Sequence, residues 1–127
     1  MRAVIQRVSY GSVTVENKKI GEIDNGLVVL LGVDINDKQD DISWLANKIT
    51  NLRIFADKKN LMNNSLITVN GDLMIISQFT LFAKTKKGNR PSYMNAAKSP
   101  KAIKYYNSFC DEIESILRKK VIRGIFG

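Results

Sequence analysis

The sequence predicts a mixed α/β fold in a single domain that spans residues 1–127. Three patterns support this prediction: apolar and polar residues alternate early in the chain, two long apolar runs follow, and two further segments repeat apolar residues at helical spacing. A length of 127 residues is typical of one domain. Hydrophobic residues make up 44% of the chain, which is enough to build a core and argues against disorder.

The first elements are predicted to be strands. The alternation over residues 3–23, broken by a polar turn at residues 16–19, predicts strands joined by tight turns. After the turn signal at residues 24–26, the run at residues 27–33 is rich in leucine and β-branched residues. Such a run is typical of a central strand that is buried on both faces.

The middle of the chain changes to helical spacing. Apolar residues recur every three or four positions over residues 37–51, and Asp40 and Asp41 precede them, as suits a helix N-terminus. Residues 53–55 could form a short strand, and a polar stretch follows at residues 57–65. We therefore expect one helix here, followed by a largely irregular segment.

A second buried strand is predicted over residues 72–82, and it carries three polar side chains: Ser77, Gln78 and Thr80. A buried hydroxyl or amide without a partner costs about 1–3 kcal/mol, so each of these groups needs a hydrogen bond. Backbone groups at the strand end could provide those bonds, and so could a ligand. Both interpretations remain open from the sequence.

Residues 83–99 form a connection longer than most loops in compact domains, and long ordered loops are often functional. Ser99 and Pro100 then predict a helix start, with a helix that continues to about Lys119. Cys110 falls on its apolar face and is expected to be a core residue. The predicted apolar face comprises Ala102, Ile103, Tyr106, Phe109, Cys110, Ile113, Ile116 and Leu117.

The residue types exclude several kinds of chemistry. The chain contains no histidine and one cysteine, so it has no Ser-His-Asp triad, no Cys-His pair and no intrachain disulfide. Its glycines match neither a P-loop nor a dinucleotide-binding motif. We expect no cofactor and no metal. We also find no signal peptide and no apolar segment long enough for a membrane span, and we therefore expect a cytoplasmic protein.

The formal net charge of +8 is concentrated in the last third of the chain. Residues 1–83 hold nine basic and nine acidic side chains, whereas residues 84–127 hold eleven basic and three acidic ones. A block of this kind favours a partner with a phosphate backbone, although a solvated lysine-rich surface would look the same. The long loop contributes Tyr93, which could stack on a base, and the candidate phosphate contacts Lys84, Lys86, Lys87 and Arg90.

Several segments together resemble the D-aminoacyl-tRNA deacylase family, formerly called D-tyrosyl-tRNA deacylase. The similarity covers the whole chain and includes the signature Ser77-Gln78-Phe79-Thr80-Leu81 and the loop Gly88-Asn89-Arg90-Pro91-Ser92-Tyr93. The other matching segments are residues 1–8, 12–15, 26–33, 52–55 and 62–63.

The resemblance implies a homodimer with a three-layer β/β/α sandwich fold. It also implies hydrolysis of the ester that joins a D-amino acid, or mischarged glycine, to the 3′-terminal adenosine of tRNA, which is a proofreading step in translation. The backbone N–H groups of Phe79 and Thr80 would hold the oxyanion, while the 2′-hydroxyl of the adenosine assists the attack. The substrate-binding residues would be Ser77, Gln78, Leu81, Arg7 and Met62.

Two alternatives accompany this expectation. Thr80 could act as a covalent nucleophile, but the sequence offers it no obvious base. The chain could also be a nucleic-acid-binding module without catalysis, as its basic last third would allow. In addition, the family carries a Gly-Pro motif in a final strand that excludes L-amino acids. This strand is missing from residues 1–127, so we expect weaker chiral rejection.

Overall fold

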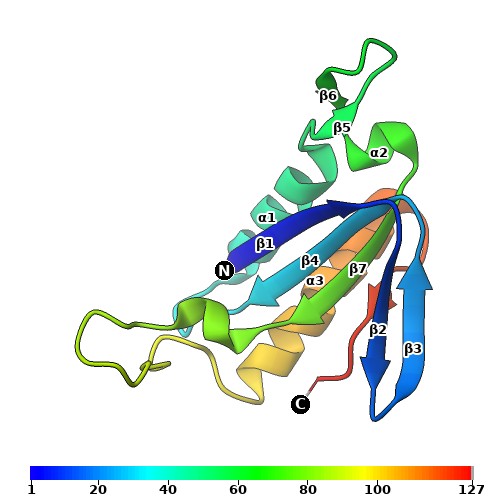
Figure 1. The fold of residues 1–127 in the computed structure, drawn as a ribbon. Helices are drawn as coiled ribbons and strands as arrows, with labels where there is room; N and C mark the ends of the chain where they lie inside the picture. Colours follow the sequence, from blue (N-terminus) through cyan, green and yellow to red (C-terminus); the bar gives the residue numbers. More distant parts are fainter. Residues whose placement is uncertain (127) are drawn as a thin grey trace.

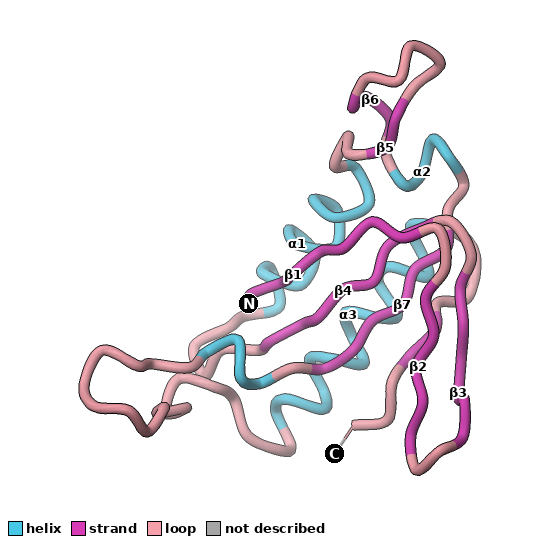
Figure 2. The backbone as a smooth tube through the Cα atoms, viewed as in Figure 1, coloured by secondary structure: helices cyan, strands magenta, loops and turns pink. Residues whose placement is uncertain are grey.

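The computed structural model describes residues 1–126, and its centre is a four-stranded sheet (Figures 1 and 2). The strand order is β1-β4-β7-β8, where β4 runs antiparallel to β1 and parallel to β7, and β8 runs parallel to β7. The predicted central strand is confirmed, because β4 is paired on both sides. The strands are β1 (Arg2–Val8), β4 (Gly26–Gly32), β7 (Asp72–Ser77) and β8 (Ile122–Arg123).

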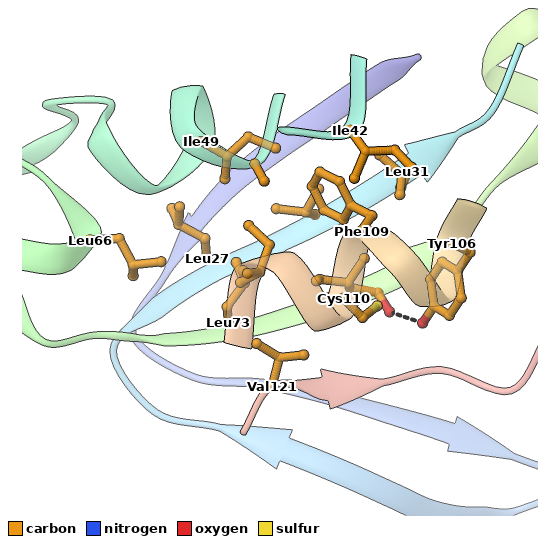
Figure 3. Packing of buried hydrophobic residues seen from close by; sticks show 14 of the residues in the cluster. Leu27, Leu31, Ile42, Ile49, Leu66, Leu73, Tyr106, Phe109, Cys110 and Val121 are labelled. Atoms are coloured by element: carbon orange, nitrogen blue, oxygen red, sulfur yellow. Dashed lines mark hydrogen bonds between the residues drawn. The ribbon is translucent and has the colours of Figure 1, made fainter. Parts of the chain in front are cut away.

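Two helices, α1 (Gln39–Asn51) and α3 (Lys101–Leu117), cover one face of this sheet (Figure 1). Their apolar faces and the inward side chains of β4 and β7 form the core shown in Figure 3. Cys110 is fully buried there, as predicted, and burial raises the pKa of its thiol to about 11. The most buried large side chains include Leu27, Leu31, Ile42, Ile49, Leu73, Phe109 and Ile113.

The hairpin of β2 (Gly11–Val15) and β3 (Lys18–Ile23) packs on the opposite face of the sheet. Gly21 of this hairpin lies so close to the Ile122 side chain that a Cβ atom at position 21 would overlap it. Hairpin, sheet and helices therefore form successive layers, and the mixed α/β prediction is confirmed. The hairpin leaves part of the sheet open: Val4 is 49% exposed, and both its cross-strand partner Leu30 and the partner of Leu30 on β7, Ile76, are only half-buried. The prediction that the central strand is buried on both faces was therefore wrong for the outer face.

The segment between α1 and β7 forms a small extension at one end of the sheet (Figure 1). It contains β5 (Phe55–Ala56), β6 (Met62–Asn64) and the short helix α2 (Leu66–Val69). The predicted short strand at residues 53–55 is thus displaced to residues 55–56. Strand β6 and helix α2 were not predicted, because their four or fewer residues are too short to show periodicity.

Three predicted boundaries were wrong. The strand expected to reach residue 82 ends at Ser77, and the 3₁₀ helix η1 (Phe79–Phe82) follows it. The last helix begins at Lys101 after Pro100, without a cap from the Ser99 side chain, and it ends at Leu117. Ile103, expected on its buried face, is 38% exposed. No helix among the described residues is both long and apolar enough to cross a membrane.

Candidate functional site

The candidate site lies where the chain leaves β7 and enters η1. The Gln78 N–H donates to the carbonyl of Leu31 over 2.8 Å, and this is the last hydrogen bond between β4 and the chain that leaves β7. Beyond it, the carbonyls of Gln78 and Thr80 accept hydrogen bonds from Leu81 and Ala83, at 3.3 and 3.1 Å. These bonds close a tight turn directly at the carboxyl end of β7.

The backbone N–H groups of Phe79 and Thr80 find no acceptor within residues 1–126. They stand at the start of η1, where the first N–H groups of a helix have no partner in the preceding turn. Phe79 is 55% exposed, and Thr80 is half-buried. Two adjacent donors without acceptors can stabilise a negatively charged oxygen in a transition state.

The polar side chains of this turn bond to each other. The Gln78 Nε2 amide donates to Thr80 Oγ1 in a short hydrogen bond. This is the only side-chain hydrogen bond that Thr80 makes within the described residues, and an amide cannot act as a general base. The arrangement gives Thr80 no partner that would activate it as a nucleophile.

Two residues that sequence analysis missed support the turn from the sheet side. Arg2 Nη1 donates to the carbonyl of Leu81 over 2.8 Å, and its guanidinium carbon lies 4.6 Å from the centre of the Phe82 ring. Gly32 provides the space for this packing, because a Cβ atom there would lie 2.9 Å from the Phe82 ring and 3.1 Å from the Gln78 carbonyl. Both lie in segments that resemble the family, but those segments did not indicate their role at the turn, since it depends on contacts between distant segments.

A cavity of about 360 Å³ opens beside the turn. Ser77 and Phe79 line it on the side of the turn, and the rings of Phe79 and Tyr93 meet edge to face with centres 5.2 Å apart. The structure thus brings Tyr93 of the long loop to the signature segment. The walls that the sequence analysis did not assign to the site include Val33, Ala96, Ala97, Lys98, Ala102 and Phe126.

Main-chain bonds fasten this wall to the end of the central strand. The Ala97 N–H donates to the Val33 carbonyl over 2.8 Å, and the Ile35 N–H donates to the Asn95 carbonyl over 3.0 Å. The short loop at residues 93–97 is therefore bonded to the segment that directly follows β4. Tyr93 and Ala97 of this loop lie in the cavity wall.

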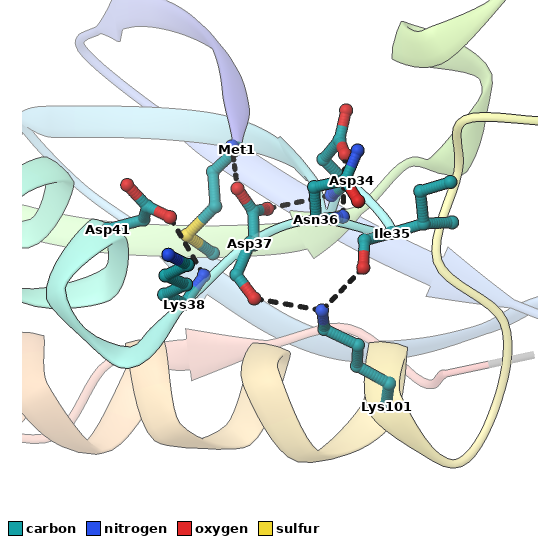
Figure 4. A network of polar contacts seen from close by, with 8 residues as sticks. All are labelled: Met1, Asp34, Ile35, Asn36, Asp37, Lys38, Asp41 and Lys101. Atoms are coloured by element: carbon teal, nitrogen blue, oxygen red, sulfur yellow. Dashed lines mark hydrogen bonds and ion pairs between the residues drawn. The ribbon is translucent and has the colours of Figure 1, made fainter.

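A polar network holds residues 34–37, the segment that follows Val33 in the chain (Figure 4). The amino group of Met1 forms a buried ion pair of 2.6 Å with Asp37, whose other carboxylate oxygen accepts the Asp34 N–H over 2.7 Å. Lys101 Nζ donates to the carbonyls of Ile35 and Asp37 at 2.7 and 2.8 Å. The network therefore ties the start of α3 to the segment that follows β4.

The basic residues proposed from the sequence lie on a projecting loop next to the cavity. Lys84 and Ser92 exchange two backbone hydrogen bonds of 2.8 and 2.9 Å, which close the base of this loop. Lys86, Lys87 and Arg90 lie beyond that pair and are exposed. Figure 1 shows the loop extending away from the body of the protein.

Arg7 and Met62 are not brought to the turn within one chain. Arg7 pairs with Leu27 at the start of β4, whereas Ser77 pairs with Leu31 at its end. At the usual rise of a strand, Leu27 and Leu31 lie about 13 Å apart. Arg7 Nη1 donates to the Ile54 carbonyl over 2.6 Å. Met62 is 68% exposed in the extension at that same end.

The described residues contain no group of three or more Asp, Glu or Cys side chains that could hold a metal ion. The chemistry that this arrangement offers comes from the main chain: two free N–H donors next to a half-open cavity. The described fold is that of an α/β protein whose chain turns into a 3₁₀ helix at the carboxyl end of a parallel strand pair.

Solved structures share this architecture. A structure described as c-Myc DNA Unwinding Element Binding Protein matches with a TM-score of 0.95 and 36% identity, over 100% of this chain and 86% of that chain. A structure described as a probable eukaryotic D-amino acid tRNA deacylase matches with a TM-score of 0.82 over 98% of this chain and 88% of that one. Its identity of 17% supports the fold alone.

The sequence comparisons identify the family. The family model for D-Tyr-tRNA(Tyr) deacylase matches residues 4–127. D-aminoacyl-tRNA deacylases from Flavobacterium psychrophilum and Parabacteroides distasonis are 53% and 52% identical over 127 residues, which are 100% of this chain and 85% of each relative. The chain therefore belongs to the D-Tyr-tRNA(Tyr) deacylase family, as its sequence motifs predicted.

Proposed function

We propose that this protein hydrolyses the ester bond between a D-amino acid and the 3′-terminal adenosine of tRNA. Its membership of the deacylase family supports this reaction. The observation that carries the proposal is the pair of backbone N–H groups at Phe79 and Thr80, which have no acceptor among residues 1–126. Glycine attached to a non-cognate tRNA is a further substrate in this proposal, because glycine has no side chain that the pocket must reject.

The proposed mechanism needs no catalytic side chain. Water attacks the ester carbonyl carbon, and the negative charge that develops on the carbonyl oxygen is stabilised by the two N–H groups. The 2′-hydroxyl of the substrate assists this attack, and the 3′-oxygen leaves with a proton. The products are the free D-amino acid and tRNA. Such a mechanism suits a chain that contains no histidine.

In this proposal the cavity receives the adenosine. The aromatic rings of Phe79 and Tyr93 and the small side chains of Ala96 and Ala97 provide the apolar walls that a heterocyclic base requires. The aminoacyl group would then extend past Ser77, Gln78 and Leu81 toward the free N–H groups. This list of site residues extends the one proposed from the sequence.

A homodimer is part of the proposal. The open part of the sheet presents Val4, Leu30 and Ile76, and an exposed apolar patch on a sheet favours association. A second copy that docks there in antiparallel orientation would place its Arg7 and Met62 near the turn of the first copy. These two residues would then contribute to the site from the partner, which accounts for their distance from the turn within one chain.

The tRNA backbone would lie along the projecting loop that carries Lys84, Lys86, Lys87 and Arg90. These side chains offer positive charge without ion-pair partners among the described residues. The protein would act in the cytoplasm, where aminoacylated tRNA is used.

The alternative is a nucleic-acid-binding module without catalysis. The basic loop and the 36% identical structure described as a DNA unwinding element binding protein favour this alternative. The test is to incubate the purified protein with D-tyrosyl-tRNA and with L-tyrosyl-tRNA and to measure the tyrosine released. Release of D-tyrosine well above the spontaneous rate supports the deacylase, whereas tRNA binding without release favours the binding module.

A further inference from the structure

Lys98 lines the cavity and has no electrostatic partner within the described part of the chain. No carboxylate lies within ion-pair distance of its ammonium group in residues 1–126, and its side chain makes no hydrogen bond there. Its neighbour Lys101 is different, since Lys101 Nζ is bound to two backbone carbonyls. Lys101 therefore serves the fold, while the charge of Lys98 remains available to a ligand.

The backbone of Lys98 is nevertheless fixed. Its carbonyl accepts the Ala102 N–H over 3.0 Å in the first turn of α3, and the preceding residue, Ala97, is bonded to the Val33 carbonyl. The Lys98 side chain thus extends from a rigid point in the wall. Ser99, which follows it, also lines the cavity and offers a hydroxyl group as a second donor.

The rest of the wall constrains the kind of ligand. Phe79, Tyr93 and Phe126 supply aromatic surface, and the remaining wall is mostly small and apolar. Lys98 is the only charged side chain among the cavity-lining residues of the described chain. An apolar cavity with one ammonium group and one hydroxyl at its wall suits a flat heterocycle that carries a single anionic substituent.

We propose that Lys98 binds the 5′-phosphate of the nucleotide whose base occupies the cavity, with Ser99 as a second donor. The inference rests on the proposed function, in which this nucleotide is the 3′-terminal adenosine of tRNA. The ester on its 3′ side must reach the free N–H groups beyond Ser77. The 5′-phosphate is the one anionic group of this nucleotide, and Lys98 is the one cation in the described wall. This contact would position the terminal nucleotide for hydrolysis without touching the reacting atoms.

Calorimetric titration with adenosine and with adenosine 5′-monophosphate tests this contact. We expect the wild-type protein to bind the monophosphate about tenfold more tightly than adenosine at low salt, as one charge-assisted hydrogen bond allows. The preference should increase as pH rises through about 6, where the phosphate gains its second charge. Lys98→Gln should abolish the preference and leave adenosine binding unchanged.

Lys104→Gln is the matched control, because Lys104 is an exposed lysine of α3 that does not line the cavity. It should retain the tenfold preference. Equal affinity of the wild-type protein for both ligands would refute the phosphate contact and leave the adenosine cavity intact. Loss of the preference in both variants would also refute it, since a general charge effect would then explain the binding. If neither ligand bound, the cavity assignment itself would be wrong, and the inference would be refuted together with it.

Discussion

Replacement of Gly32 by alanine should impair catalysis through packing alone. The new Cβ atom would lie 2.9 Å from Phe82 Cε2 and 3.1 Å from the Gln78 carbonyl oxygen. Ordinary carbon–carbon contacts are about 3.5–4.0 Å, so the ring and the turn must withdraw by roughly 0.5 Å. Overpacking of this kind typically costs about 1–3 kcal/mol of folding free energy.

The same displacement moves the two N–H donors of Phe79 and Thr80, which belong to that turn. Because a misplacement of about 1 Å can cost about 100-fold in rate, we expect Gly32→Ala to lower the rate constant for D-tyrosyl-tRNA hydrolysis by about tenfold. The rate is measured by release of D-tyrosine at saturating enzyme. It is corrected for the folded fraction, which urea unfolding provides.

Gly71→Ala is the matched control for this experiment. A Cβ atom at Gly71 would lie 2.7 Å from Leu66 Cδ1 and 3.1 Å from the Asn25 carbonyl, so the crowding is similar. Gly71 precedes β7, however, and lies at the end of that strand away from the turn. Both variants should lose stability, and only Gly32→Ala should lose activity per folded molecule. Full activity in a destabilised Gly32→Ala protein would refute the link between this packing and the donors.

Three further predictions address the mechanism, the tRNA contact and the fold. Thr80→Ala should retain most of its deacylase activity, because the hydroxyl has no base to activate it; a covalent acyl-enzyme detected by mass spectrometry would contradict this. Reversal of Lys86 and Lys87 to glutamate should weaken tRNA binding and reduce the log–log salt slope by about one unit per lost phosphate contact; an unchanged slope would show that these lysines lie away from the backbone. Burial alone would raise the pKa of Glu114, but hydrogen bonds from the Val121 N–H and Arg123 lower this pKa overall. The Glu114 carboxylate therefore stabilises the fold above about pH 4.5, and this stabilisation is lost as pH falls below its folded-state pKa. Glu114→Gln should therefore lower Tm at pH 7, and this loss should shrink in thermal melts as pH falls below about 4.5.

The elements that the sequence predicted well are those whose pattern is long enough to be periodic. The central strand and the two long helices follow from apolar spacing over at least seven residues, and tertiary packing preserved them. The exit of the chain from β7 was not predictable in the same way. Residues 73–82 are mostly apolar and favour one continuous strand. In the structure, however, Gly32 is the last paired residue of β4, and β7 has no residue to pair with beyond Ser77.

The residues of the candidate site also differ in whether a local sequence pattern could identify them. The signature residues 77–81 could be identified because they are contiguous, and Tyr93 could be identified as the one aromatic residue in a basic loop. Arg2, Gly32 and Phe126 could not, because each reaches the site from a different part of the chain through contacts that only the fold creates. Their residue types are common in strands and chain ends, so no local pattern distinguishes them.

Free N–H donors in the main chain also bear on how such a site responds to mutation. An amide hydrogen is present whatever side chain occupies the position, with proline as the exception, so ordinary substitutions at Phe79 or Thr80 cannot delete the donor. Damaging variants should instead collect at neighbouring positions that set the path of the backbone. A random-mutagenesis map of inactive clones would then outline the packing around the turn, with Thr80 itself tolerant to most residue types.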